Sequence, residues 1–446
     1  MLLRQDDQDQ IAYHVTSNLT SYHGFNERFK KILEAFNDEF QLLSCNMFDY
    51  FDDSKQSTEE FDRKMDLCYQ LKNIISKHNS TWLFNIVPTG STVTGLATKN
   101  SDLDVAIHIP QAAKLLEEMH SDIYHIEEER NRLWRGMQLE ILQIVRLLLE
   151  NDEQIKSRID WNKGVQLVQA QIQILKIETV DGIDCDVSVV MDPFLSSMHN
   201  SFMIRHFANI DARFAPLCAV VKQWAASSGV KNPKEGGFNS YALVILVIHF
   251  LQCGAYPPIL PHLSKLYKDD NFIAQNDRQY PLRLDFGAPL PRALPTVSAN
   301  HSSLAQLFLE FLHYYLKFDF HMYFISMRDA MIKNRQQSMH PTVKNEIQKE
   351  VHIEDPFDAH NPGRTVRSLH HIKKVLKDTI NLFIPVYVPN EDIDTQKKNF
   401  HFPTLDDILF MATSNSHLEA FEEHAQDDET QNEGPSTSGV PPNVIS

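Results

Sequence analysis

The sequence predicts an α+β fold in which strands are concentrated before residue 200 and helices follow it. Residues 82–109 and 168–190 each combine β-favouring runs with a glycine-containing turn, as the strands of a sheet do. Beyond residue 200, long apolar segments with helical spacing dominate. The 446 residues leave room for two or three domains, and 42% hydrophobic and 23% charged residues are ordinary for a soluble protein.

Composition argues against several classes of protein. No run of about 18 apolar residues exists, and the first ten residues are polar and acidic, so we expect neither a signal peptide nor a membrane span. Five scattered cysteines without zinc-ligand spacing predict reduced, mostly buried thiols. They indicate an intracellular location, for which we expect the cytoplasm rather than the nucleus.

Two helices are expected near the N-terminus, after a disordered segment over residues 1–20. Residues 25–43 place apolar side chains at helical spacing. Ser57 to Glu60 resembles a capping box that starts the second helix. The apolar stripe of that helix is formed by Phe61, Met65, Cys68, Leu71 and Ile75. A β-favouring run then extends over residues 82–87 and ends at Pro88.

A turn of glycine and small hydroxyl residues begins at Gly90 and leads to Asp102-Leu103-Asp104 and an apolar run. Glycine lets the backbone turn and present N–H groups to a phosphate. Residues two apart in a strand point to the same face, so Asp102 and Asp104 project together. Hard divalent ions such as Mg²⁺ prefer such paired carboxylates, which would otherwise repel each other. Two solvated acids at a strand edge are the alternative.

This stretch resembles the signature of the DNA polymerase β-like nucleotidyltransferase superfamily, and most closely that of the non-canonical poly(A) and poly(U) polymerases, which extend RNA 3′ ends. The resemblance implies that Gly90 and Ser91 hold the phosphates of a nucleotide. It also implies that Asp102, Asp104 and a third Asp from a later strand hold two metal ions, Mg²⁺ or Mn²⁺. It covers roughly residues 60–390.

The third carboxylate is expected on a strand that follows a hairpin turn at Asp181-Gly182. Residues 168–174 alternate apolar and Gln residues and predict one half-exposed strand before that turn. Residues 183–190 form the returning strand. Asp186 fits the family pattern best, because apolar residues flank it and a small polar residue follows two positions later. Asp184 is the alternative.

The helical half carries further residues to which the resemblance gives a role. Asn200 would contact the ribose, because an amide both donates and accepts hydrogen bonds. Lys222, in a helix expected over residues 215–225, would reach the triphosphate and offset charge on the leaving pyrophosphate. Many relatives carry a second basic residue one turn later, where this chain has Ala226.

An apolar helix is expected from Leu243 to Leu251, with Asn239 or Ser240 as its cap. The resemblance implies that Ser240 contacts the triphosphate near this helix N-terminus, which favours phosphate. It also implies that Tyr241 stacks on the base. Stacking tolerates any base, so Tyr241 does not choose among nucleotides.

Residues 353–365 resemble the base-recognition segment of the family, and they follow an aromatic helix expected over residues 304–320. In uridine-adding relatives a His precedes the Asn of this segment, as His360 precedes Asn361 here. His360 can donate to a carbonyl oxygen of uracil, and its ring limits the room for a purine. The gap from Asp355 to His360 is one residue shorter than the family pattern. A loop histidine without a role is the alternative.

The net charge of −17 is unusual for a protein that acts on RNA, because phosphate contacts need Lys and Arg. Nine acidic residues and no Lys or Arg lie between Asn399 and Ser446. Residues 396–446 are therefore expected to form an acidic, mostly disordered tail, with one short element at 400–411. The rest of the chain is mildly acidic too, so we expect weak RNA affinity and a separate RNA-binding adaptor protein.

The predicted architecture is a polymerase β-like nucleotidyltransferase domain with a mixed sheet over residues 58–200. A mainly helical poly(A)-polymerase-associated domain, made of residues 21–57 and 201–395, would leave the nucleotide in a cleft. The expected activity is template-independent addition of uridines from UTP to RNA 3′-OH ends by two-metal phosphoryl transfer, in RNA 3′-end processing, turnover or silencing. The alternatives are a poly(A) or mixed-tailing enzyme and an inert scaffold that binds RNA or a partner; template-directed DNA synthesis is disfavoured.

Overall fold

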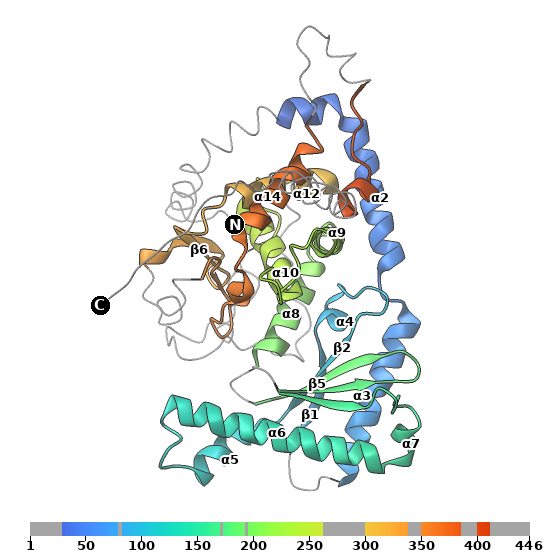
Figure 1. Ribbon diagram of the computed structural model, residues 1–446, viewed down its shortest axis with the longest axis vertical. Helices are drawn as coiled ribbons and strands as arrows, with labels where there is room; N and C mark the ends of the chain where they lie inside the picture. Colours follow the sequence, from blue (N-terminus) through green and yellow to red (C-terminus); the bar gives the residue numbers. More distant parts are fainter. Residues whose placement is uncertain are drawn as a thin grey trace, which may run out of the picture.

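The computed structural model shows a sheet unit and a helical unit, each with its own hydrophobic core (Figure 1). It describes residues 29–78, 83–169, 173–191, 195–261, 299–337, 349–384 and 399–410. The expectations for residues 1–20, for the boundary near residue 395 and for most of the acidic tail lie outside the described residues. Among the described residues, no helix combines the length and apolar character needed to span a bilayer.

A five-stranded mixed sheet forms the first unit, in the order β1-β2-β5-β4-β3. β2 and β5 run parallel, and the other neighbouring strands run antiparallel. The strands are β1 (Asn85–Thr89), β2 (Leu103–His108), β3 (Val165–Gln169), β4 (Gln173–Glu178) and β5 (Asp184–Val190). The expected mixed sheet is thus confirmed. Pro88 lies inside β1 rather than ending it, because β1 is an edge strand and one side of it needs no N–H donor.

Helices cover one face of this sheet and leave part of the other face open. α3 (Thr58–His78) and α6 (Glu127–Asn151) pack on it and share its core. The shorter α5 (Ala112–Met119) and α7 (Glu153–Lys156) lie near the two ends of α6 (Figure 1). Leu103 and Val105, both 0% exposed, face these helices. Alternate residues of β2, including Asp104, therefore point to the opposite face.

The expected single strand over residues 168–174 is wrong. The segment belongs to two antiparallel strands, β3 and β4, in which Gln169 lies opposite Gln173. Residues 170–172 lie outside the described residues. The apolar–polar alternation of the sequence continues with the same period from β3 into β4, so the pattern does not reveal that the two strands run antiparallel. The turn at Asp181-Gly182, by contrast, joins β4 to β5 as expected, with Gly182 at φ 80°.

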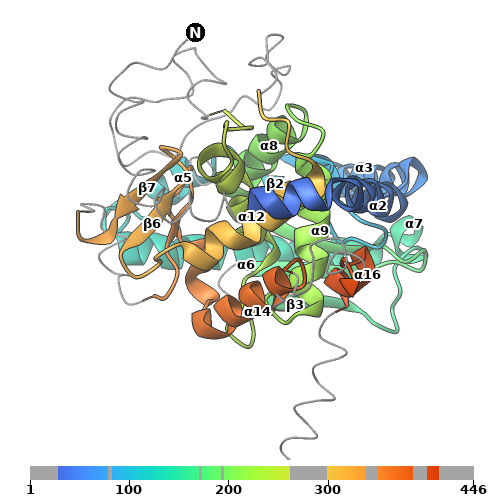
Figure 2. The ribbon, with the colours of Figure 1, turned by 90° about the horizontal axis from the view of Figure 1, so that it is seen from above.

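The second unit is a helical array around one large core (Figure 2). Its helices are α2 (Asn37–Ser54), α8 (Ser196–Ala208), α9 (Phe214–Ser227), α10 (Ser240–His249), α12 (Leu304–Lys317), α14 (Leu369–Asn381) and α16 (Leu405–Leu409). α2 continues to Ser54, well past the expected end at Leu43, because Met47 extends its buried stripe. α16 is the short element expected near the C-terminal end of this unit.

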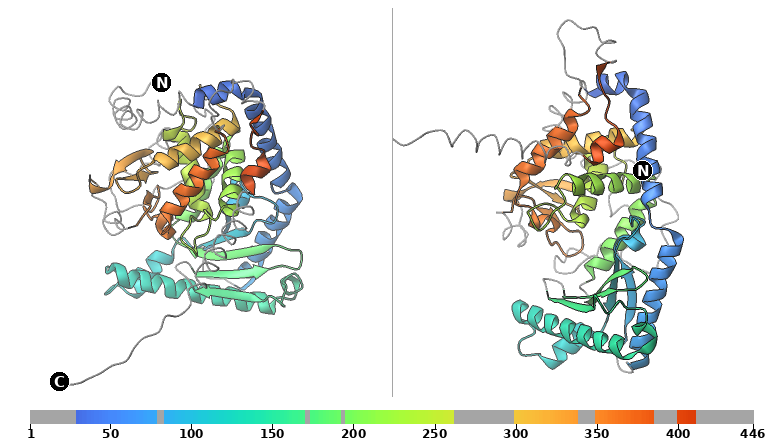
Figure 3. Two further views of the ribbon diagram at one scale, coloured as in Figure 1. Left: turned by 45° about the horizontal axis from the view of Figure 1, so that its top comes forward. Right: turned by 45° about the vertical axis from the view of Figure 1, so that its right-hand side comes forward.

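α8 links the two units. Leu195 and Met198, at its start, pack on Ala106 of β2, whereas Met203 and Phe207 belong to the helical core. A small three-stranded sheet, β7-β6-β8, lies at the edge of the helical unit (Figure 3). Its strands are β6 (Tyr323–Ser326), β7 (Met331–Asn334) and β8 (Ile353–Glu354). β8 leads directly into the expected base-recognition segment.

Candidate active site

Three carboxylates lie on the open face of the sheet, where β2 and β5 begin. Asp104 is paired with Asp186 across the parallel ladder, and Asp102 directly precedes β2. Paired positions of neighbouring strands point to the same face, so the three side chains share one. Asp184, the alternative third carboxylate, is exposed at the first position of β5, whereas Asp186 is partly buried next to Asp104. The arrangement favours Asp186.

Burial and the neighbouring carboxylates disfavour the charged forms of Asp102 and Asp104. Burial, together with the charges of Asp186 and Asp102, raises the pKa of Asp104 to about 6. Burial, and then the charges of Asp186 and Asp184, raise the pKa of Asp102. A divalent cation would relieve this repulsion, and carboxylate oxygens are the ligands that Mg²⁺ prefers. The donor set therefore fits a divalent metal site.

The turn before β2 is built closely around Asp104. Gly90 has a φ of 69°, which glycine adopts readily, and a Cβ atom there would lie 2.0 Å from Oδ2 of Asp104. The amide of Gly90 donates to Oγ of Ser201 at 2.9 Å, which ties the turn to α8. Ser91 begins a single helical turn, α4 (Ser91–Thr94), and its side chain is partly exposed. Glycine thus brings the backbone against a carboxylate without steric bulk.

Two lysines that the sequence analysis missed lie next to the carboxylates. Nζ of Lys176, on β4, lies 3.3 Å from Oδ1 of Asp186. Lys64, on α3, is 1% exposed, and its Nζ donates to the carbonyl oxygen of Ser101, directly before Asp102, at 2.6 Å. Neither lysine belongs to a local motif. The pairing of β4 with β5, which places Lys176 opposite Asp186, could have revealed Lys176, but the strand expected over residues 168–174 ended before it. No feature of the sequence indicated Lys64.

Asp355 brings together residues expected at the base and the ribose. Its Oδ2 accepts hydrogen bonds from Nδ2 of Asn200 at 3.0 Å and from the hydroxyl of Tyr241 at 2.6 Å. These residues come from α8, α10 and the segment after β8, which are far apart in sequence. Asp355 is 1% exposed, so the bonds form in a dry environment. No local motif indicates this anchoring role of Asp355, because its partners lie on distant segments.

His360 lies beside Tyr241, with ring centroids 6.3 Å apart and planes 22° apart. Nδ1 of His360 lies 2.5 Å from Oδ1 of Asp358. Within the described part of the chain, no hydrogen-bond partner is found for Nε2, so this atom is available to a ligand. Ala359 adopts a φ of 58°, and this left-handed residue accommodates the short connection from Asp355 to His360.

Neighbouring charges set the protonation of this site. Burial, and then the charge of Asp358, raise the pKa of Asp355 to about 6. Burial opposes ionisation of Asp358, but the hydrogen bond with His360 prevails and lowers its pKa to about 2. Burial likewise opposes the charge on His360, yet the hydrogen bond with Asp358 and the charge of Asp355 raise its pKa. Protonated His360 presents Nε2–H as a donor.

The residues expected at the ribose and the triphosphate lie in the helical unit. Oδ1 of Asn200 is buried, and no hydrogen-bond partner for it exists among the residues that the structure describes. It can therefore accept a bond from a ribose hydroxyl. Asn239 caps α10 by accepting from the amide of Ala242 at 2.8 Å, so the cap is Asn239 and Ser240 opens the helix. Lys222 lies on α9, partly exposed. No described contact joins it to the sheet carboxylates.

A second group of possible ligands comes closer together than the sheet carboxylates. The candidate ligand atoms of Asp355, Asp358 and His360 all lie within 4.8 Å of one another. These groups, however, already bond to neighbours: Asp355 accepts from Asn200 and Tyr241, and Asp358 pairs with His360. We therefore interpret this group as a hydrogen-bonded base site. The sheet carboxylates, which repel one another, fit the metal ions better.

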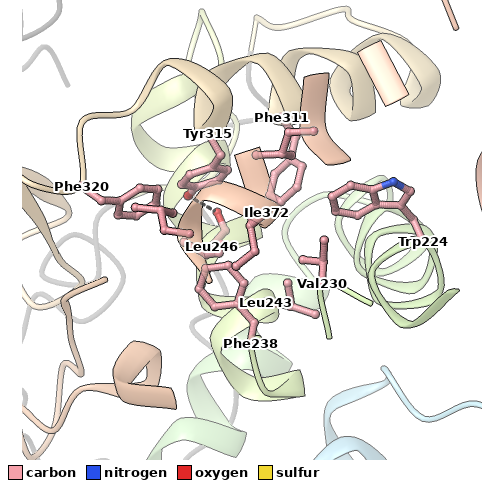
Figure 4. Close-up of a pocket in the computed structure, with 11 residues that line it drawn as sticks. Trp224, Val230, Phe238, Leu243, Leu246, Phe311, Tyr315, Phe320 and Ile372 are labelled. Atoms are coloured by element: carbon pink, nitrogen blue, oxygen red, sulfur yellow. Dashed lines mark hydrogen bonds between the residues drawn. The ribbon is translucent and has the colours of Figure 1, made fainter. Parts of the chain in front are cut away.

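An apolar pocket inside the helical unit is separate from this site. Figure 4 shows its lining, which includes Trp224, Val230 and Phe238. The hydroxyl of Tyr315 donates to the carbonyl oxygen of Leu246 at 2.7 Å, so this polar group is already satisfied. The described residues that line the pocket include no charged side chain for a nucleotide. The pocket therefore belongs to the packing of the core.

Two family models match separate parts of the chain. The model described as "Poly(A) RNA polymerase, mitochondrial-like, central palm domain" matches residues 43–209. The model described as "Cid1 family poly A polymerase" matches residues 303–361. The first range contains the sheet and its carboxylates, and the second extends from α12 to the base segment with His360.

Curated relatives share part of their length with this chain. The Poly(A) RNA polymerase gld-2 homolog B of Drosophila melanogaster is 28% identical over 333 residues, which cover 74% of this chain and 23% of that protein. The Poly(A) RNA polymerase GLD2 of Mus musculus is 33% identical over 217 residues, which cover 48% of this chain and 41% of that protein. The chain thus spans between about a fifth and a half of the length of the curated relatives that it matches.

Solved structures share the fold. The crystal structure of the Cid1 poly(U) polymerase superposes with a TM-score of 0.58 at 22% identity, covering 82% of this chain and 97% of that chain. Cid1 in complex with the UTP analogue UMPNPP gives the same values. The likeness shows a polymerase β-like nucleotidyltransferase fold with a poly(A)-polymerase-associated domain. The two family models, which match residues 43–209 and 303–361, show that the chain belongs to the non-canonical poly(A) and poly(U) polymerases.

Proposed function

We propose that the chain is a template-independent RNA 3′-terminal nucleotidyltransferase that favours UTP. The RNA 3′-OH would attack the α-phosphorus of the nucleotide, and a new oxygen–phosphorus bond would replace the bond to the leaving pyrophosphate. Divalent cations, Mg²⁺ or Mn²⁺, would lower the pKa of the 3′-OH and offset charge on the pyrophosphate when bound. Asp102, Asp104 and Asp186 would hold them, and no protein nucleophile is required.

The other proposed roles divide the nucleotide into three parts. The turn at Gly90, where glycine leaves room beside the carboxylates, and the hydroxyl of Ser91 would accommodate phosphate oxygens. Lys222 and Ser240 would hold the remainder of the triphosphate from the helical side. Oδ1 of Asn200, which has no hydrogen-bond partner in the described residues, would accept a hydrogen bond from a ribose hydroxyl. The ring of Tyr241 would stack on the base.

The position of His360 beside Tyr241 is the observation that carries the preference for UTP. The hydrogen bond between Nδ1 and Asp358, together with the charge of Asp355, raises the pKa of His360 despite its burial, and the protonated ring carries a second N–H on Nε2. This Nε2–H would be a donor at the edge of a base stacked on Tyr241. Uracil presents a carbonyl oxygen acceptor at its O4 position, whereas adenine presents an amino donor at N6. A donor at this place therefore favours uracil and leaves adenine with two donors facing each other.

Adenylation is the second candidate. The curated relatives described above are named poly(A) RNA polymerases. In addition, the short connection before His360 distinguishes this loop from the pattern of uridine-adding enzymes. In this case the metal and phosphate chemistry would be unchanged, and His360 would not select the base.

A separate RNA-binding adaptor is part of the proposal. More than half of the net charge of −17 lies in the acidic stretch from Asn399 onward, but the remaining residues are also net negative. RNA affinity depends on contacts between phosphates and Lys or Arg. We therefore propose that another protein delivers the RNA, in the cytoplasm.

Sequencing of the added tails tests the proposal. Purified protein would be incubated with a short RNA bearing a 3′-OH, Mg²⁺ and all four nucleoside triphosphates. We expect tails composed mainly of U. Asp102→Ala/Asp104→Ala should add nothing, yet keep its thermal transition, because removing clustered like charges does not destabilise the apo fold. His360→Ala should lower the preference for UTP over ATP by about tenfold, the equivalent of one hydrogen bond.

His370→Ala is the matched control, because His370 is an exposed histidine on α14. Tails rich in A from the wild-type protein would contradict uridylation and leave adenylation. Unchanged nucleotide choice in His360→Ala would remove the role of His360. A wild-type protein that binds no nucleotide and adds none, even to a tethered RNA, would leave the inert scaffold as the remaining hypothesis.

A further inference from the structure

Lys222 is a partly exposed cation for which the described residues provide no counter-ion. It lies on α9, and no carboxylate of the described residues forms an ion pair with it. Burial, and then the positive charge of Lys231, lower the pKa of Lys222. Two neighbouring ammonium groups repel each other, and an anion between them would offset this repulsion. The pair therefore indicates a place for an anion.

The backbone of Lys231 lies beside the end of α9, next to the residue one helical turn after Lys222. That residue is Ala226, which is exposed and carries no charge. The chain leaves α9 at Ser227, turns at Gly229 with a φ of 75°, and returns to the end of the helix. There the amide of Lys231 donates to the carbonyl oxygen of Ala225 at 2.6 Å. Lys231 is thus anchored next to Ala226.

The loop that carries Lys231 is held firmly. Val230, 1% exposed, packs with Trp224 and Phe238 in the apolar pocket, as Figure 4 shows. The amide of Phe238 donates to the carbonyl oxygen of Val230 at 2.9 Å. A Cβ atom on Gly237 would lie 2.5 Å from the same oxygen, so the two sides of the loop touch. Because Val230 is turned into the core, its neighbour Lys231 remains partly exposed.

The far side of the same loop leads into the nucleotide site. Asn239 caps α10, and Nδ2 of Asn239 donates to the carbonyl oxygen of Pro362, two residues after His360. Ser240 and Tyr241 follow at once. The loop between α9 and α10 therefore joins Lys231 to residues proposed to hold the triphosphate and the base.

We propose that Lys231 is a triphosphate-binding residue that replaces the basic residue absent at Ala226. This inference rests on the proposed function, because it assumes that a nucleoside triphosphate binds beside Lys222. The triphosphate carries several negative charges, and two lysines fixed on different segments neutralise it better than one. The ammonium group of lysine is a point charge on a long, flexible side chain, so it can reach the same place from a different backbone position.

Nucleotide binding, measured without RNA, tests the role of Lys231. Dissociation constants of UTP, ATP and UMP would be determined by calorimetry in Ca²⁺ at low salt. Lys231→Met should weaken the binding of UTP and ATP by the same factor, about tenfold, because charged hydrogen bonds to phosphate are lost. UMP lacks the two outer phosphates, so its binding should change little. Lys231→Met/Ala226→Lys should regain most of the affinity for UTP and ATP.

Lys234→Met is the matched control, since Lys234 is an exposed lysine of the same loop and its removal should leave all three constants unchanged. Thermal denaturation and Lys231→Arg, which keeps the charge, separate loss of the cation from damage to the loop. Unchanged UTP and ATP binding in Lys231→Met would overturn the inference and leave the proposed function standing. A wild-type protein that binds neither nucleotide would overturn both.

Discussion

Gly90 has no Cβ atom, and the space that this leaves is occupied by the carboxylate of Asp104. The left-handed backbone of Gly90 is one reason for glycine, but the stronger one is space, since a Cβ atom would lie 2.0 Å from Oδ2 of Asp104. Gly95 shares the first reason without the second: its φ is 81°, and nothing lies within 4 Å of an added Cβ. A comparison of substitutions at the two glycines therefore distinguishes the effect of backbone strain from that of contact with a carboxylate.

Gly90→Ala should weaken binding of Mn²⁺ by roughly 10- to 100-fold, because the methyl group displaces a carboxylate from the metal site. Gly95→Ala should cost about 1 kcal/mol of folding stability through backbone strain and leave Mn²⁺ binding unchanged. Calorimetric titration with Mn²⁺ and thermal denaturation of both variants would measure this. Equal metal affinities in the two variants would contradict the proposed position of Asp104.

Among the elements, α3 supports the metal site from the opposite side of the sheet. Lys64 is buried in this helix, and its ammonium group contacts three oxygens. It donates to the carbonyl oxygen of Ser101 and to Oε1 of Gln56, and it pairs with the carboxylate of Glu60 at 2.9 Å. A charge in this position fixes the chain just before Asp102. The helix therefore contributes to the geometry of a strand that it does not belong to.

Lys64→Met should lower the free energy of unfolding by roughly 2–4 kcal/mol, because Glu60 loses its partner and a buried carbonyl loses a donor. Urea denaturation would measure the change. Lys72→Met is the control, since Lys72 is exposed on the same helix and should shift stability by less than about 0.5 kcal/mol. Similar stabilities for Lys64→Met and the wild-type protein would show that the three contacts contribute little.

Most elements followed from local patterns, and the exceptions have physical causes. The β2 strand with its paired carboxylates, the hairpin turn at Asp181-Gly182 and the cap of α10 depend on neighbouring residues, so the sequence carried them. The strand predicted over residues 168–174 was wrong because side-chain alternation survives a reversal of the chain. Asp355 and Lys176 could not be placed, since their partners come from distant segments whose register only the folded sheet and helices define.

At the scale of the whole molecule, stability depends on the protonation of a partly buried carboxyl group in the helical unit. Glu310, on α12, is partly buried, and burial raises its pKa from 4.5 to about 7, although Gln306 donates to it and Arg213 attracts it. Between these two pH values the unfolded chain releases this proton more readily than the folded chain. The folded state therefore loses stability as the pH rises from about 4.5 to about 7.

Glu310→Gln removes this titration. When the pH rises from 5 to 8, the free energy of unfolding of the variant should increase relative to that of the wild-type protein by up to about 3 kcal/mol. One pKa unit corresponds to about 1.4 kcal/mol. Urea denaturation at both pH values would measure the difference. Glu140→Gln, an exposed replacement on α6, should track the wild-type protein at both values. A Glu310→Gln difference that is independent of pH would assign the titration to other groups.

The parallel pairing of β2 with β5 has a consequence for how this gene can change in length. Asp104 meets Asp186 only while the two strands keep their register, although a long stretch with helices and two strands separates them. Residues gained or lost in the surface connections of that stretch leave the register intact. A single codon deleted between Asp184 and Asp186 would instead turn the third carboxylate toward the core. Insertions and deletions should therefore be tolerated in the connections and eliminated from these few positions.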